Sequence, residues 1–221
     1  MKKLTAISVL ALGALTAFST ASANTVFTDR ATFITAINPN AAEDFNSITV
    51  DTQFRTQSVV VGDFTITGEP GANGNGSNLI DAGVAQFSDT YTLDNTTYLL
   101  GDLSSPEELR IDFNVGVTAW GADFAGFSNQ PRATDIVFYD AGDNVIGTIS
   151  EQTSDNSSRT FLGIDLMGDV ASYVILSNSV GSNDVFGIDN VAYNTAPVPV
   201  PGAAVLFGGA LAGFFGRRLK K

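Results

Sequence analysis

Carboxylates are the side chains that could give this sequence a reactive or metal-binding site. The chain holds 23 Asp and Glu residues, and it has neither histidine nor cysteine. A Ser-His-Asp or Cys-His site is therefore excluded, and so are the usual zinc sites. Two kinds of carboxylate chemistry remain, which are proton transfer between facing carboxyl groups and coordination of a hard cation such as calcium.

Three close pairs of acidic residues could in principle serve a glycosidase: Glu43–Asp44, Glu107–Glu108, and Asp140 with Asp143. A glycosidase needs two carboxyl groups that face each other across a cleft, about 5 to 10 Å apart. With so many acidic residues, adjacency along the chain is expected by chance. No Gly-x-Ser-x-Gly elbow and no phosphate-binding glycine loop is present. A carboxylate-based glycoside hydrolase or polysaccharide lyase is therefore the alternative function, and a non-catalytic protein is the first.

Asp189 is the acidic residue with the most informative surroundings. Strict strand alternation over residues 186–193 places it on the same side as Val191 and Tyr193. A carboxylate on an apolar face needs hydrogen-bond donors or a cation, unless it lies at the rim of the sheet or in a hydrogen-bonded turn. The rim and the turn remain open alternatives.

We expect one structural calcium ion, with Asp44, Asp189 and Asn190 as ligands. Calcium takes six to eight oxygens and mixes carboxylates with amide or backbone carbonyls. Asp44 lies early and Asp189 lies late, and the first and last strands of jelly-roll modules commonly lie close together. The chain also lacks disulfides, so packing or a bound metal must supply its stability.

Two other polar stretches are predicted to be connections. Residues 71–78, which are rich in glycine and asparagine and lead to Asp81, have the character of one calcium-binding repeat. Such repeats act in stacks, so a single copy predicts a surface loop. Residues 140–144 lack the alternating ligands and distal Glu of a calcium loop, and their composition favours a hairpin turn.

The elements that must position these residues are short strands. The apolar and alternating segments predict strands at 58–61, 64–67, 109–115, 117–124, 135–139, 145–150, 160–164, 171–178 and 187–193. Trp120 is in phase with Ala122 and Phe124, which predicts a core position and not a sugar-stacking platform. One helix is expected at 28–37, because Thr28 or Asp29 can cap it and Pro39 ends it. The fold class is therefore all-β, a jelly-roll-like β-sandwich with one short N-terminal helix.

The N-terminal residues 1–23 have the pattern of a secretory signal peptide. Lys2 and Lys3 precede an apolar run, and the small residues Ala21 and Ala23 mark a cleavage site for signal peptidase. The central domain then spans residues 24–195. Six of the 11 basic residues of the chain lie in its two ends, which leaves the domain with a formal charge near −18. This charge argues against nucleic acid and anionic lipid as partners.

The C-terminal residues 196–221 combine a proline box, a short apolar run and a basic end. The box is Val198, Pro199, Val200, Pro201 and Gly202, and the basic residues are Arg217, Arg218, Lys220 and Lys221. The apolar run is shorter than the ~20 residues of a permanent span. Basic residues after an apolar run hold that end on the cytoplasmic side of a membrane. An ordinary C-terminal membrane anchor is the alternative interpretation.

At these residues the chain resembles the PEP-CTERM class of bacterial sorting signals, most closely the variant whose box is Val-Pro-Leu-Pro-Ala. The resemblance implies transient insertion in the inner membrane as a helix, cleavage by an exosortase, and release to the cell surface or extracellular matrix. Short segments at 29–33, 139–147 and 186–191 are similar to ectodomains that carry this tail. The family therefore implies a non-catalytic, exopolysaccharide- or biofilm-associated protein that binds carbohydrate or is structural.

Overall fold

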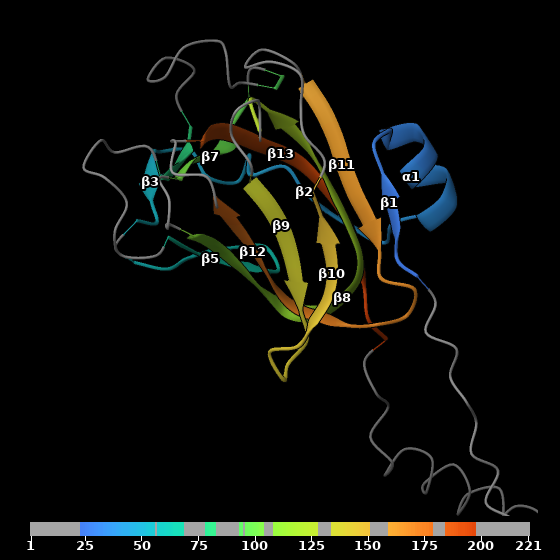
Figure 1. Cartoon of the computed structure of the whole chain (residues 1–221). Helices are drawn as coiled ribbons and strands as arrows, with labels where there is room; N and C mark the ends of the chain where they lie inside the picture. The colour runs from blue at the N-terminus through green and yellow to red at the C-terminus, as the bar shows by residue number, and fades with distance from the viewer. Residues whose placement is uncertain are drawn as a thin grey trace, which may run out of the picture.

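The computed structural model describes residues 23–55, 57–68, 78–82, 93–94, 96–103, 108–127, 134–150, 159–178 and 184–197. These residues form one short helix and thirteen strands, all paired antiparallel, so the predicted all-β class is confirmed (Figure 1). The elements in chain order are β1 (Thr25–Phe27), α1 (Arg30–Ile37), β2 (Ala41–Glu43), β3 (Thr52–Gln53), β4 (Val59–Val61), β5 (Phe64–Gly68), β6 (Leu79–Asp81), β7 (Tyr98–Leu103), β8 (Glu108–Ala125), β9 (Thr134–Tyr139), β10 (Val145–Ile149), β11 (Arg159–Asp165), β12 (Ala171–Asn178) and β13 (Asp184–Thr195).

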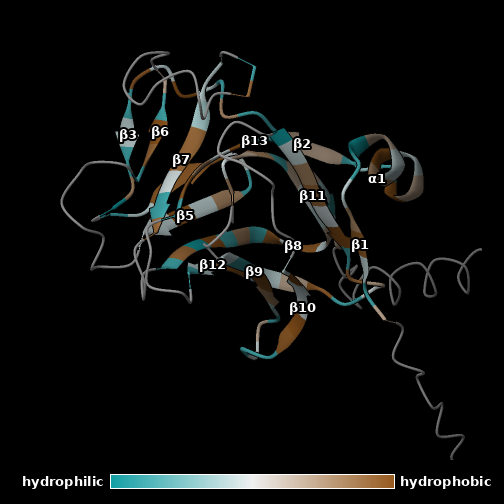
Figure 2. Ribbon diagram, turned by 45° about the horizontal axis from the view of Figure 1, so that its top comes forward, coloured by the Kyte–Doolittle hydropathy of each residue, from teal (hydrophilic) through white to brown (hydrophobic). Residues whose placement is uncertain are grey.

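The long strand β8 belongs to both layers of a sandwich. Its first part, residues 108–117, pairs with β12 and β5, and its second part, residues 119–125, pairs with β11 and β13. The first layer therefore has the order β10-β9-β12-β8-β5-β4. The second layer has the order β1-β11-β8-β13-β7-β6-β3, with β2 paired to the later part of β13. Figure 2 shows the first layer below and the second layer above.

One hydrophobic core fills the space between the two layers. Alternate side chains of β8 and β12, such as Ile111 and Val174, enter it from the first layer, while Phe186 and Ile188 enter it from β13 in the second. Such alternation is what a half-buried strand requires. Trp120 is 1% exposed in the same cluster, which confirms the predicted core position.

Helix α1 covers the outer face of the second layer beside β1 and β11 (Figures 1 and 2). The Asp29 carboxylate caps it by accepting a hydrogen bond from the Thr32 backbone N–H at 2.8 Å, as the sequence predicts. Phe33 is its one fully buried side chain and packs on Phe161 in a second, smaller core. The next residue, Ile34, is 40% exposed although it is apolar.

Tight turns join the hairpins at the predicted places. Gly62 adopts φ +53° between β4 and β5, a conformation that glycine reaches without steric cost. Between β9 and β10, Asp140 Oδ1 accepts hydrogen bonds from the backbone N–H groups of Gly142 and Asn144, at 2.8 and 2.9 Å. The predicted hairpin turn at residues 140–144 is therefore confirmed.

Two predicted strands are one in the structure, and strands β1, β2, β3, β6 and β7 were not predicted. The sequence favoured separate strands at 109–115 and 117–124, whereas β8 runs through Gly116 without a break. Gly116 has no side chain, and an added Cβ would lie 2.4 Å from a methyl group of Val170, so this glycine permits a close approach inside the strand.

Several predicted features fall outside the described residues. They are residues 1–22 of the signal peptide, most of the 71–78 loop, and the sorting motif with the basic end at 198–221. Within the described part of the chain, no helix is both long enough and apolar enough to cross a membrane.

Candidate functional site

The structure brings the three predicted calcium ligands into one region. Strand β2 pairs with β13 so that Glu43 lies opposite Val191, and this places Asp44 beside the end of the Asp189–Asn190 segment. Asp44 and Asn190 both line a groove of about 910 Å³ between α1, β2 and β13. Within the described ranges, no group of three or more acidic side chains is arranged to hold a metal ion. The three predicted ligands themselves supply two carboxylates and one amide.

A β-bulge at Asn190 decides where Asp189 points. Asp189 lies opposite Asp123 of β8, but the next partners are Ala192 and Gly121, so β13 carries an extra residue here. Asn190 has φ +52°, which asparagine tolerates better than most residues.

The bulge corrects the alternation inferred from the sequence. Ile188 and Val191 both lie in the main core although they are three positions apart. The phase of the strand is therefore shifted between them. Asp189 faces away from Val191 and Tyr193, on the outer side of the second layer.

The Asp189 side chain is fully buried there, and only one of its two carboxylate oxygens has a hydrogen-bond partner. Its Oδ1 accepts a hydrogen bond from the Asn190 backbone N–H at 2.6 Å, while its Oδ2 is buried without a partner among the described residues. Burial raises the pKa of Asp189 to about 7, the Asn190 hydrogen bond opposes this effect, and repulsion from Asp94, Asp44 and Asp123 adds to it. We call these four carboxylates the acidic basin.

Two cationic side chains border the acidic basin. Arg30 of α1 donates through Nε to Asp123 Oδ1 at 3.0 Å, donates through its guanidinium to the Asn190 carbonyl, and lies 4.9 Å over the ring of Phe161. The second is Arg159, whose positive charge acts on Asp94. Hydrogen bonds from Thr96 and from the Asn190 side chain, together with this charge, lower the pKa of Asp94.

Sequence reasoning missed Arg30, Asp94 and Asp123 as members of this site. They come from three segments that are distant along the chain, and only the fold brings them together. Asp123 alone gave a usable signal, because it is the single charged residue in the apolar segment 117–124.

A second candidate site lies on the outward face of the first layer. The strand register aligns Tyr139, Tyr173, Asp112 and Thr65 in one row across β9, β12, β8 and β5. The rings of Tyr139 and Tyr173 are stacked, with centroids 4.8 Å apart and planes 9° apart. The Arg110 guanidinium lies 3.7 Å from the centroid of the Tyr173 ring.

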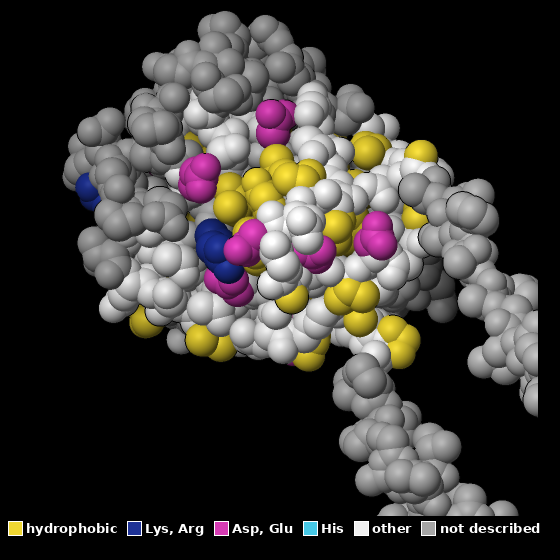
Figure 3. Space-filling model, turned by 60° about the horizontal axis from the view of Figure 1, so that its bottom comes forward, with side chains coloured by type: hydrophobic (Ala, Val, Ile, Leu, Met, Phe, Trp, Pro, Cys, Tyr) yellow, Lys and Arg dark blue, Asp and Glu magenta, His cyan; other side chains and the backbone are white. Residues whose placement is uncertain are grey.

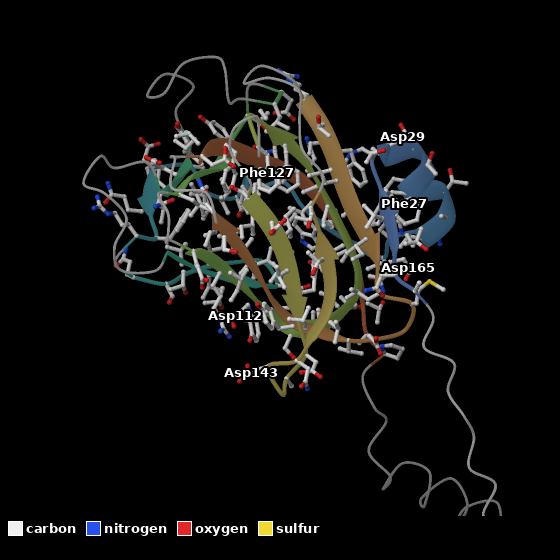
Figure 4. The ribbon with its side chains drawn as sticks, viewed as in Figure 1. Phe27, Asp29, Asp112, Phe127, Asp143 and Asp165 are labelled. Carbon is white, nitrogen blue, oxygen red and sulfur yellow. The ribbon has the colours of Figure 1, made fainter. Side chains whose placement is uncertain are left out.

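Hydrogen bonds hold this row in place. Arg110 Nε contacts the Asp112 carboxylate at 2.9 and 3.0 Å, and the Tyr173 hydroxyl donates to Asp143 Oδ1 at 2.9 Å. The hydrogen bonds that Arg110 donates to Asp112 raise the pKa of Arg110, while burial and the hydrogen bond to Asp143 raise the pKa of Tyr173. Asp112 and Asp143 lie toward the same end of the first layer (Figure 4). We call Arg110, Asp112, Tyr139, Asp143 and Tyr173 the tyrosine–arginine face.

The charged groups of the tyrosine–arginine face are accessible to solvent. The side chains of Arg110 and Asp112 are 36% and 35% exposed, whereas Tyr173 is 7% exposed. Figure 3 shows a face of the molecule on which apolar side chains lie next to acidic and basic ones. Fixed polar groups beside apolar surface are the usual ingredients of a ligand site. Trp120 and Tyr98 are both buried, so neither is a sugar-stacking platform.

Comparison with protein-family models and with curated proteins finds no match. Among solved structures the chain is similar to the C-terminal domain of a chitobiase from Bacteroides fragilis, at 16% identity over 64% of this chain and 99% of that domain, with a TM-score of 0.37. It is also similar to CpGH89CBM32-6 produced by Clostridium perfringens, at 13% identity over 61% and 94%, with a TM-score of 0.35. A family 43 arabinoxylan arabinofuranohydrolase from Bacillus subtilis matches at 10% identity over 48% of this chain and 22% of that enzyme, with a TM-score of 0.33. At these TM-scores the likeness carries no functional argument.

Proposed function

We propose that this protein is an exported, non-catalytic module that holds polysaccharide on the tyrosine–arginine face. The observation that carries the proposal is the stack of Tyr139, Tyr173 and Arg110 on the outer face of the first layer, with the Arg110 side chain 36% exposed. A sugar presents hydroxyl groups around an apolar ring, so its site needs apolar surface beside fixed donors and acceptors. Arg110 and Asp112 supply such donors and acceptors next to the two rings.

The geometry favours an extended polymer as the ligand. Both faces of the Tyr173 ring are occupied, one by Tyr139 and the other by Arg110. A sugar therefore meets ring edges, the exposed parts of Tyr139 and the charged groups, and each such contact is weak. Several weak contacts along one row of strands bind a long chain better than a single sugar unit, because linked contacts add by effective concentration.

Catalysis is the weaker alternative because two of the three acidic pairs have other roles, while Glu107 of the third lies outside the described residues. Glu43 Oε1 accepts from the Phe45 backbone N–H, and Asp44 Oδ1 accepts from that of Asn46. Asp140 and Asp143 belong to the β9–β10 hairpin. Asp189 has the raised pKa of a general acid, but it is fully buried and cannot reach a glycosidic oxygen.

Export and sorting complete the proposal. Signal peptidase would remove residues 1–23, and an exosortase would act at the box of residues 198–202 after transient insertion of the tail in the inner membrane. The support is the order of proline box, apolar run and basic end in the sequence. The strongly acidic domain would then reside at the cell surface or in the extracellular matrix.

A panel of purified polysaccharides separates binding from catalysis. We expect the central domain to be retained by at least one acidic or neutral polysaccharide without releasing reducing sugars. Release of sugars would overturn the proposal and favour the hydrolase or lyase. Absence of both retention and release would leave a purely structural protein and would also contradict it.

A further inference from the structure

We propose that one calcium ion binds at the edge of the acidic basin, held by Asp189, Asp44 and Asn190, with the buried Oδ2 of Asp189 as the innermost ligand. This oxygen is the unusual feature, because a fully buried carboxylate oxygen without any partner is rare in native proteins. The backbone bulge holds the carboxylate in this orientation, and Asn190 satisfies only the other oxygen. A cation would satisfy the remaining oxygen.

The charges of the basin match a divalent cation. Four carboxylates, those of Asp44, Asp94, Asp123 and Asp189, act on one another here. Arg30 neutralises one of them through Asp123, and Arg159 acts on Asp94. The remaining formal charge is −2.

The available oxygens suit calcium better than magnesium or zinc. Calcium accepts irregular sets of six to eight oxygens from carboxylates, amides, backbone carbonyls and water, whereas magnesium demands a regular octahedron. Asp189 and Asp44 offer carboxylates, and the Asn190 amide oxygen is available because its NH₂ group donates to Asp94. The groove lined by Asp44 and Asn190 gives water access to the remaining positions.

Such an ion would join the two ends of the domain. Asp44 follows β2 near the start of the described chain, whereas Asp189 and Asn190 lie in β13. Arg30 already links α1 to the same bulge through the Asn190 carbonyl. Calcium would therefore fasten the N-terminal segment to the last strand.

The test is a set of thermal melts of the central domain in millimolar calcium and in chelator, with sodium chloride at matched ionic strength. Affinities of extracellular calcium modules are about 10⁻⁴ to 10⁻³ M. At about 10 mM free calcium, a ten- to hundredfold excess over such dissociation constants, we expect the wild-type midpoint to rise by about 3–10 °C. Isothermal titration with calcium chloride should give one site.

The variant Asp189→Asn gives the decisive comparison. In chelator we expect it to be at least as stable as the wild type, because the amide removes a buried, repelled charge. In calcium we expect the wild type to be the more stable of the two. The midpoint of Asp189→Asn should rise no more in calcium than it does in sodium chloride at matched ionic strength. Asp169→Asn is the matched control, since Asp169 is exposed and lies outside the acidic basin, and it should keep the full response.

Three results would overturn the proposal: no calcium response in the wild type, an equal rise in sodium chloride, or a full response in Asp189→Asn. Asp44→Asn guards against a folding defect, because Asp44 is exposed and the change is conservative. This variant should lower calcium affinity about tenfold or more, and unchanged affinity would remove Asp44 from the site. The polysaccharide panel tests the opposite layer of the sandwich, so either proposal can fail without the other.

Discussion

At the scale of single residues, the costliest group in the described structure is the carboxyl group of Asp189. Its burial and three neighbouring carboxylates both favour the protonated form, and burial is the larger cause. The carboxylates of Asp29 and Asp140 show the opposite behaviour, because hydrogen bonds from neighbouring residues lower their pKa values. Aspartate therefore stabilises the folded state as a helix cap at Asp29 and in the hairpin turn at Asp140, whereas the buried charge of Asp189 destabilises it.

The raised pKa of Asp189 predicts an unusual pH dependence in the presence of chelator. Because its pKa in the folded protein is about 7, Asp189 holds its proton up to about that pH, whereas the unfolded chain releases it near the ordinary aspartate pKa of 3.8. Stability from this group is therefore complete below the unfolded pKa and is lost as the pH rises through the folded pKa. Asp94, Asp44, Asp123 and Arg30 are the charged groups that face it.

Urea unfolding at pH 5 and pH 8 measures this effect. We expect the free energy of unfolding to be lower at pH 8 by a few kcal/mol, on the order of 2–4. The carboxyls with lowered pKa values act in the opposite direction, but they do so only below about pH 4, outside this window. Asp189→Asn should flatten the curve between the two pH values. An equally steep curve in the variant would assign the pH dependence to another group.

At the scale of elements, strand type and turn chemistry were predictable, and the irregularities of the strands were not. Alternation identified the half-buried part of β8, and the Asp-Gly-Asn composition identified the β9–β10 turn. The local sequence pattern does not indicate that β8 continues through Gly116 or that β13 has a bulge at Asn190. Both irregularities are imposed by neighbouring strands, which a sequence pattern does not contain.

The candidate sites divide in the same way. The proximity of Asp44 to the Asp189–Asn190 segment was predictable because first and last strands tend to meet. The tyrosine–arginine face was not, since Arg110, Tyr139 and Tyr173 lie on three strands and come together only through the strand register.

Gly121 tests the close contact between β8 and β11. A Cβ at this position would lie 2.4 Å from the Phe161 ring and 3.1 Å from the Gly163 Cα. We expect Gly121→Ala to lower the free energy of unfolding by about 1–3 kcal/mol, because the ring must shift. In a Phe161→Leu background most of this loss should disappear. Equal losses in the two backgrounds, measured as a double-mutant cycle, would show that Phe161 is not the obstacle.

At the scale of the whole molecule, the sandwich separates two surfaces for which we propose different roles. The acidic basin lies on the outer side of the second layer, where the two ends of the domain meet. The tyrosine–arginine face lies on the outer side of the first layer, across the core. A stabilising ion on one side and a polymer on the other would not compete for space.

Processing at both ends is also a property of the whole chain. We expect the intact mass of the protein recovered from its native source to lack residues 1–23 and the basic residues that begin at Arg217. Substitution of Pro199 and Pro201 by alanine should leave the tail attached, because the extended box is lost. A native mass that retains the basic end would favour the ordinary membrane anchor.

The most direct test of the proposed function is the affinity of one retained polysaccharide for the wild type, for Arg110→Gln and for Arg159→Gln, each measured by titration calorimetry. Arg110 stacks on Tyr173 in the tyrosine–arginine face, whereas Arg159 is exposed at the start of β11 in the second layer. We predict that Arg110→Gln weakens binding at least about tenfold, which corresponds to about 1.4 kcal/mol. We predict that Arg159→Gln binds as the wild type does. Equal affinities of the wild type and the folded Arg110→Gln variant would contradict binding at this face.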